Sequence, residues 1–225
     1  MNPTTRIVGA IGITLLIGNA ASHAQSWTDN LYVHTDIGPA FIPDRRTTTY
    51  TIALPFDGLT RGHGHFQVDT GVRGDLALGY NLSKSFALEV EAGGIWSPDS
   101  DPRDSFYQIP AMLNAIYQIH ISDSWKAYVG AGAGGVVSMV HTEYRDAAFH
   151  SPIIREASDW SPGYQAEAGI KYAFSRHIDI DLGYKFLGVV EYDYTFGNIP
   201  SPDFAIVKVN NLYTHSAQLS LTWKF

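Results

Sequence analysis

Two pairs of acidic residues have the types and spacing that could support catalysis. Glu89 with Glu91, and Asp179 with Asp181, are each separated by one residue. Alternate residues of a β-strand point to the same face, so each pair would place two carboxylates side by side. Such a pair could act as general acid and base. Strand geometry alone produces this spacing, so the pairs by themselves do not indicate catalysis.

Two other motifs lack parts that their chemistry requires. Residues 130–135 (GAGAGG) match the glycine spacing of a nucleotide-binding loop, but no helix follows them, as that loop requires. We expect these glycines to form a groove that admits a bulky neighbour such as Tyr128. His215 and Ser216 are adjacent, and adjacent residues of a strand face apart, so they cannot form a hydrolytic dyad.

Polar residues in the loops are candidates for metal binding. His63 and His65 could begin a site, but no third ligand follows at a diagnostic spacing. Asp99, Asp101 and Asp104 lack the ligand order of a calcium loop. We therefore predict no catalytic, cofactor-binding or metal-binding residues, and a protein that is not an enzyme.

The segments that carry these residues alternate between apolar and polar positions. In residues 213–225 the odd positions are apolar, except His215, and the even positions are polar. This two-residue period predicts a strand, here 212–225, because a helix would scatter the same residues around its axis. Pro110 lacks a backbone donor, so we expect a bulge or a late start in its strand. The other strands are predicted at 31–41, 70–82, 85–96, 106–120, 124–140, 164–174 and 177–188.

The connections between these eight strands alternate in length. The short ones are 81–84, 121–123 and 175–176, and the long ones are 42–69, 97–105, 141–160 and 190–211. Outer-membrane barrels have short periplasmic turns and long extracellular loops. We therefore predict an all-β fold, an eight-stranded antiparallel up-and-down transmembrane β-barrel, formed by residues 25–225. The rival is a soluble barrel of lipocalin type, with its apolar face inward.

The first 24 residues resemble an export signal. Arg6 precedes an apolar run over 7–17, and Ser22 and Ala24 are small residues at cleavage positions. The run is too short to span a bilayer comfortably, which takes about 20 residues. We expect Sec-type export and cleavage after Ala24. The chain has no cysteine and a formal net charge of −7, so neither disulfides nor nucleic-acid binding is expected.

The last seven residues, 219–225 (LSLTWKF), carry a family resemblance. The chain resembles the small outer-membrane β-barrel family that includes the OmpA membrane domain, OmpX and the opacity-type surface proteins. The resemblance implies that Trp223 and Phe225 form an assembly signal read by the barrel-assembly machinery. It also implies location in the outer membrane of a Gram-negative bacterium, with outer-membrane lipid and lipopolysaccharide as partners.

The polar strand faces predict a charged interior. An eight-stranded barrel is just wide enough to be filled with side chains, and an isolated buried ion costs several kcal/mol. The inward charges must therefore pair, and we expect a salt-bridge network that plugs the lumen. Its predicted members are Asp36, Arg73, Asp75, Glu89, Glu91, Lys126, Glu167, Lys171, Asp179, Asp181 and Lys185.

These expectations favour a non-enzymatic, monomeric barrel with an envelope structural or surface-interaction role. Function would depend on the four long extracellular loops, because loops on a rigid scaffold commonly carry function. These loops would bind a surface ligand. One alternative is a narrow pore for small solutes or ions. A second alternative is a lipid A-modifying enzyme.

Overall fold

The computed structural model describes residues 28–52, 59–99, 104–145, 152–196 and 205–225. The predicted export signal, 1–24, lies outside these residues. A short 3-10 helix, η1 (Thr28–Asn30), precedes a chain of strands. The strands are β1 (Leu31–Phe41), β2 (Arg45–Ile52), β3 (Leu59–Phe66), β4 (Gly71–Asn81), β5 (Phe86–Pro98), β6 (Ser105–His120), β7 (Trp125–Arg145), β8 (Pro152–Ala173), β9 (Ile178–Phe196) and β10 (Ala205–Lys224).

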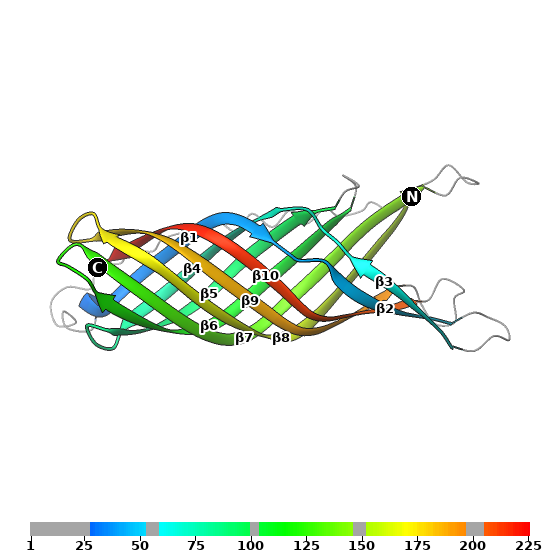
Figure 1. The fold of residues 1–225 in the computed structure, drawn as a ribbon, viewed down its shortest axis with the longest axis horizontal. Helices are drawn as coiled ribbons and strands as arrows, with labels where there is room; N and C mark the ends of the chain where they lie inside the picture. The colour runs from blue at the N-terminus through cyan, green and yellow to red at the C-terminus, as the bar shows by residue number, and fades with distance from the viewer. Residues whose placement is uncertain (1–27, 53–58, 100–103, 146–151, 197–204) are drawn as a thin grey trace, which may run out of the picture.

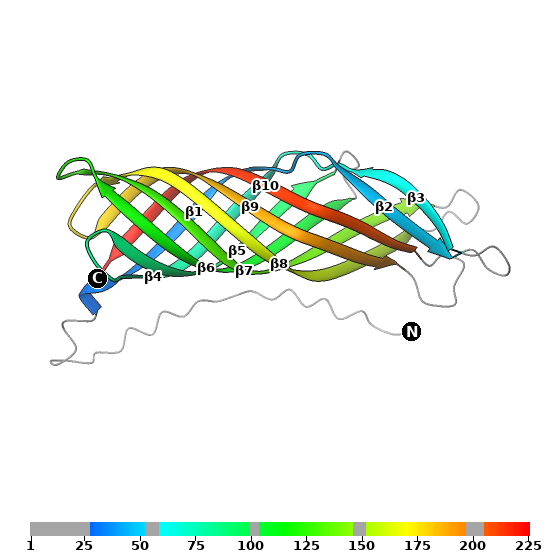
Figure 2. The same ribbon diagram turned by 60° about the horizontal axis from the view of Figure 1, so that its bottom comes forward.

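Eight of these strands form a closed ring. The order is β1-β4-β5-β6-β7-β8-β9-β10, and β10 pairs back with β1, so the ring has no free edge. Every pairing is antiparallel. Figures 1 and 2 show an elongated cylinder of tilted strands, with the C-terminus at one end and β2 and β3 at the other. The predicted eight-stranded antiparallel up-and-down barrel is confirmed.

The two ends of the cylinder differ. Short turns at 82–85, 121–124 and 174–177, close to their predicted positions, lie at the end that holds the C-terminus, which we call the turn end. At the other end, which we call the extension end, β7 to β10 continue well beyond their predicted limits. The prediction that 141–160 and 190–211 are loops was therefore wrong for most of their length.

β2 and β3 form a hairpin within the segment 42–69, which was also predicted to be a loop. The hairpin continues the β1–β4 pair in the same register: Ala40 lies opposite Gly71, and after the interruption Arg45 lies opposite Phe66. β2 also pairs with β10 in the register that β1 uses. The ten strands are thus eight long strands, two of which are interrupted, at 42–44 and 67–70.

The predicted bulge or late start at Pro110 was wrong. β6 begins at Ser105, and its buried and exposed residues alternate without a break through Pro110. Its pairing with β5 omits Gly93 and Gly94, opposite Pro110 and Ile109, and then resumes in the same register. The missing donor is thus absorbed by a local gap in the ladder, without insertion of an extra residue.

The inward-facing positions change parity in the parts of β9 and β10 nearest the extension end. In β10 the even residues from Leu212 to Thr222 are buried, but above them Val209 is buried. Asn211 lies between the two regions with a φ of 53°, a left-handed conformation that asparagine adopts more readily than most residues. In β9 the buried positions change from odd to even, at Tyr192 and Tyr194. We call this local change of conformation and parity the kink. Beyond it, both tyrosines and Val209 belong to the core at the extension end.

The outer wall of the ring is apolar. Leu78, Val90 and Leu182 are between 56% and 68% exposed, whereas their polar neighbours point inward. This arrangement excludes the lipocalin-type alternative, which needs the apolar face inside. Among the described residues, no helix is long and apolar enough to cross a membrane.

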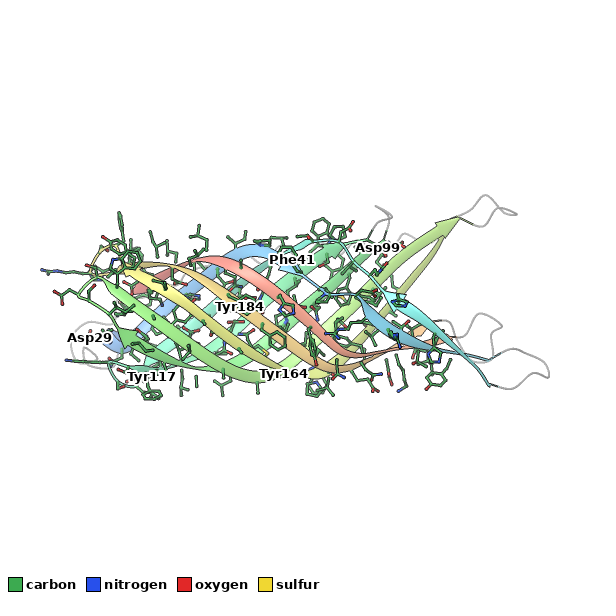
Figure 3. All side chains as sticks on the ribbon, in the orientation of Figure 1. Asp29, Phe41, Asp99, Tyr117, Tyr164 and Tyr184 are labelled. Carbon is green, nitrogen blue, oxygen red and sulfur yellow. The ribbon has the colours of Figure 1, made fainter. Side chains whose placement is uncertain are left out.

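Aromatic side chains form two belts on this wall. Near the turn end, Phe86 packs on Tyr117 and Trp125 packs on Tyr172, with ring centroids 4.8 and 4.9 Å apart. The second belt includes Tyr164, and Figure 3 shows Tyr117 and Tyr164 at well-separated levels of the cylinder. Two aromatic girdles around an apolar band are typical of a barrel that spans a membrane.

Candidate functional site

Lys185 lies at the centre of the interior. Its ammonium donates to Asp36 Oδ2 at 2.9 Å, Asp75 Oδ2 at 3.0 Å and Glu91 Oε2 at 2.9 Å. The side chain is 1% exposed. Three charge-assisted hydrogen bonds use all three donors of the ammonium.

Arg73 supplies the second central cation and has no exposed side-chain surface. Its Nε donates to Asp75 Oδ2 at 2.6 Å, and its Nη2 donates to Glu91 Oε1 at 3.1 Å and to Gln165 Oε1 at 2.7 Å. Asp75 and Glu91 therefore each bridge the two cations. Opposite charges so close together offset part of the cost of removing each one from water.

Three amides complete this layer. Gln165 and Asn114 donate to the carboxylate of Glu91, and Gln218 donates to Asp36 Oδ1 at 2.8 Å. β7 contributes Gly132, where a Cβ would collide with Asn114 Oδ1. We call this layer the central tier; it draws side chains from seven of the eight ring strands. Its members are Asp36, Arg73, Asp75, Glu91, Asn114, Gln165, Lys185 and Gln218.

A second polar layer lies nearer the turn end. Tyr32 donates to Glu89 Oε1 at 2.7 Å, and Tyr128 donates to Asp181 Oδ1 at 3.0 Å. Lys171 donates to Thr222 at 3.1 Å, and its Nζ lies 3.8 Å from Asp181 Oδ2. Tyrosine hydroxyl groups thus donate to the carboxylates of this layer, in addition to the lysine.

The position of Tyr128 differs from the expectation. The Tyr128 ring lies against Gly169 and Gly183, on β8 and β9, rather than in a groove made by residues 130–135. The space at Gly130 is occupied by Ile116 and Glu167. The glycines do admit neighbouring side chains, but the predicted pairing was wrong because sequence alternation does not identify neighbours across the lumen.

The remaining predicted charges lie at the turn end or beside the central tier. Lys126 is half-buried, and Asp179 accepts a hydrogen bond from Lys224 at 2.7 Å. Both lysines and Asp179 line a cavity of only 30 Å³, about the volume of one water molecule. Glu167 is buried with Oε2 4.0 Å from Lys185, and its Oε1 accepts no hydrogen bond from the described residues.

Sequence reasoning missed the uncharged and histidine members of the interior. His34 is buried, with Nε2 3.5 Å from Asp36 Oδ2 and Nδ1 3.0 Å from Thr222 Oγ1. Like Asn114, Gln165 and Gln218, it occupies an inward position of the same two-residue period. That periodicity was the available signal, because every inward polar group needs a partner, not only the charged ones.

Towards the extension end the interior becomes apolar. Ile95, Phe106 and Leu187 belong to a buried hydrophobic cluster that also includes Tyr192 and Tyr194. Several polar groups in this region bond to one another: Ser138 lies 2.6 Å from the Tyr194 hydroxyl, and Thr214 donates to Gln108 at 2.8 Å. The lumen is therefore filled by side chains above the central tier as well.

Side chains replace the backbone ladder where β8 and β9 separate. The paired register ends at Gly163 and Val189. Beyond it, the backbone N–H of Asp193 donates to Asp159 Oδ2 at 2.7 Å, and that of Glu191 donates to Ser161 at 3.4 Å. Asp193 and Glu191 also accept from Lys208, and these hydrogen bonds raise the pKa of Lys208.

The catalytic and metal-binding candidates do not assemble into a site. In each acidic pair the two carboxylates have separate partners: Glu89 has Tyr32, whereas Glu91 has Lys185 and Arg73. His215 lies on the outer wall, 2.6 Å from the Tyr184 hydroxyl, and Ser216 is buried inside. Asp101 lies outside the described residues, within which no three His, Cys, Asp or Glu residues group to hold a metal ion.

The proposed assembly signal lies on the outer wall at the turn end. Trp223 is 47% and Phe225 56% exposed, and Trp223 stacks on His177 with ring centroids 6.5 Å apart. Both side chains are therefore accessible from outside the barrel.

A closed antiparallel ring with an apolar outer wall and a polar, filled interior defines the class of transmembrane β-barrels. The sequence model of the family described as "Outer membrane protein beta-barrel domain" matches residues 11–225. The chain belongs to this family, whose members reside in the Gram-negative outer membrane. Because outer-membrane barrels place their short turns in the periplasm, we expect the extension end to be extracellular.

Solved structures support the same fold at low sequence identity. OprG from Pseudomonas aeruginosa matches with a TM-score of 0.58 and 14% identity, covering 88% of this chain and 98% of its own. Neisserial surface protein A matches with a TM-score of 0.52 and 16% identity, covering 87% of this chain and 97% of its own. The outer membrane protease OmpT from Escherichia coli matches with a TM-score of 0.52 and 10% identity, covering 88% of this chain and 97% of its own. No curated protein sequence matches the chain.

Proposed function

We propose that this protein is a closed, non-enzymatic outer-membrane barrel whose extracellular strands serve a structural or surface-interaction role. The observation that supports this proposal is the central tier. Two cations, three carboxylates and three amides from seven strands span the lumen. They hydrogen-bond to one another and so do not line an open channel. A barrel braced in this way gives a rigid support for whatever its extracellular end presents.

The extracellular end forms an extended platform of strands. β2 and β3 add to β9 and β10, and the β7–β8 hairpin extends from the same end of the barrel (Figures 1 and 2). These strands hold exposed polar groups such as Lys208 and Glu156 above the second aromatic belt. We propose that this platform, rather than the four long loops predicted from the sequence, is the surface that contacts an envelope component or an external ligand.

The proposal retains the partners and export route expected from the sequence. Outer-membrane lipid and lipopolysaccharide would surround the wall of a monomer, and the barrel-assembly machinery would engage Trp223 and Phe225. Sec-type export would precede insertion. The likeness to OmpT shows a shared fold alone, and the separated His215 and Ser216 give no support to lipid A modification.

Planar bilayer recording tests whether the lumen is closed. We expect the purified protein to show no steady conductance, because the central tier fills the interior. The triple variant Glu91→Ala, Asn114→Ala, Gln165→Ala removes side-chain volume from β5, β6 and β8, and between β6 and β8 lies β7, which contributes only Gly132. Lys185 keeps Asp36 and Asp75 in this variant, and we expect it to conduct. Steady channels in the unmodified protein would support the narrow-pore alternative instead.

The lipid A mass spectrum of expressing cells tests the non-enzymatic role. We expect the spectrum to be unchanged, and a modified spectrum would contradict this role.

A further inference from the structure

The outer face of the β2–β3 hairpin gathers basic side chains around a hollow. Arg46, His63 and His65, with Gly64, line a cavity of 360 Å³. Arg46 lies directly opposite His65 in the ladder, and His63 lies opposite Thr48. Cross-strand partners project to the same face of a sheet, so all three side chains share this face. They are exposed, whereas Thr47, on the other face, is buried.

Arg46, which the fold places on the same face as the two histidines, determines whether the site suits a metal cation or an anion. A metal site would need a third neutral or anionic ligand, but Arg46 brings a guanidinium, which is always charged and has only donors. A guanidinium on the same face as two imidazoles repels a metal cation and attracts an anion. Its planar fork matches the oxygens of a phosphate group.

One of the imidazoles is held in position. His65 Nδ1 lies 3.0 Å from Asp44 Oδ2, and Gln67 donates to the same oxygen at 3.1 Å. With Nδ1 committed to Asp44, Nε2 is the ring nitrogen that remains for a ligand. When the ring is protonated, both nitrogens donate, so His65 can bond to Asp44 and to an anion together.

The hairpin lies close to the outer surface of the membrane. Arg45, next to Arg46, holds its guanidinium 4.2 Å from the ring centroid of Tyr213. Tyr213 packs on Phe186, which packs on Tyr164 of the second aromatic belt. The base of β2 is therefore at the level of that belt, where lipid headgroups begin, and the long Arg46 side chain can extend towards them.

We propose that Arg46, His63 and His65 form a binding site for a phosphate group, supplied by the headgroup of an outer-leaflet lipid. The outer leaflet consists of lipopolysaccharide, so the phosphates of lipid A are the source. Arg46 binds the phosphate oxygens with its guanidinium, and the imidazoles of His63 and His65, on the neighbouring strand, supply further N–H donors. This inference rests on the proposed role of the extracellular platform and names one ligand for it.

Binding experiments with the full-length protein in nanodiscs test this site. The probes are diphosphorylated lipid A, dephosphorylated lipid A and inorganic phosphate. We expect diphosphorylated lipid A to bind more tightly than dephosphorylated lipid A, because only the former carries the phosphate oxygens that Arg46 can bind. Arg46→Gln should weaken this binding by about tenfold or more, as should the pair His63→Gln, His65→Gln. The matched control is His141→Gln, a histidine paired with Glu156 on the other hairpin, which should bind like the unmodified protein.

Several outcomes would overturn the proposal. These are equal binding by Arg46→Gln and the control, no preference for phosphorylated over dephosphorylated lipid A, and Zn²⁺ binding that requires both histidines. Binding of inorganic phosphate without binding of lipid A would overturn the assignment to a lipid. Bilayer conductance tests independently whether the lumen is closed. A negative result in the lipid A binding experiments would therefore not affect that part of the proposed function.

Discussion

Lys185 is the residue on which the interior depends most. Asp36, Asp75 and Glu91 all lie within 3.0 Å of its ammonium, and water has almost no access to the group. The Coulombic attraction in such a site must offset the desolvation of every charge in it. Removing Lys185 therefore leaves Asp75 and Glu91 to share Arg73, and leaves Asp36 with Gln218 and His34.

We predict that Lys185→Met lowers the free energy of unfolding by about 3–5 kcal/mol, the usual cost of breaking a buried ion pair. Urea unfolding of the barrel in detergent micelles, followed by tryptophan fluorescence, measures this change. The control Lys84→Met, in an exposed turn, should leave stability unchanged. If both variants were equally stable, the central tier would not be what braces the barrel.

At this scale the sequence predicted which charges exist but not how they pair. Alternation indicates the face of a strand on which a residue lies, so the acids and bases expected inside could be chosen by position. It carries no information about contacts across the lumen. Lys185 and Asp36 are 149 residues apart, and their contact depends on the diameter and stagger of the closed ring. The amides and His34 were missed because only charges were sought.

The strands were predicted too short because their pattern changes phase. Below the kink, β10 buries its even positions, and above it Val209 is buried. A template with a fixed two-residue period fails at such a shift, so the upper halves of β9 and β10 had the pattern of loops. β2 and β3 were missed for a different reason: repeated threonine in one strand and alternating glycine and histidine in the other supply no apolar face.

Asn211 tests whether this kink depends on one residue. Its φ of 53° costs a β-branched residue about 1–2 kcal/mol, because Cβ approaches the following carbonyl. We predict that Asn211→Val lowers the free energy of unfolding by that amount and that Asn211→Gly is tolerated. Both are measured by urea unfolding, with Asn210→Val as the exposed neighbouring control. Equal effects of valine at the two positions would argue against a local conformational requirement at Asn211.

As a whole, the molecule is polarised along the barrel axis. Its turn end is polar inside, whereas its extension end is apolar inside. Figures 1 and 2 show the short turns at the former and the platform strands at the latter. The aromatic belts place the membrane around the middle of the cylinder. The platform should therefore face the medium and the short turns the periplasm.

Cysteine labelling of intact cells tests this orientation, and the natural chain offers a clean background because it contains no cysteine. We predict that His63→Cys, on the β2–β3 hairpin, reacts with a membrane-impermeant maleimide in intact cells. Lys84→Cys, in the turn between β4 and β5, should react only after the cells are broken. The reverse pattern would mean that the barrel is inserted upside down relative to our assignment.

The unbroken register from the β1–β4 pair into the β2–β3 hairpin bears on how such a surface can diversify. Because the two long strands resume in step after the interruption, paired residues could be gained or lost at the hairpin tip without displacing any partner in the ring. The membrane-embedded part and the exposed part are thereby uncoupled in length. Selection by a changing external environment can act on the hairpin while the portion that must satisfy hydrocarbon is left unaltered.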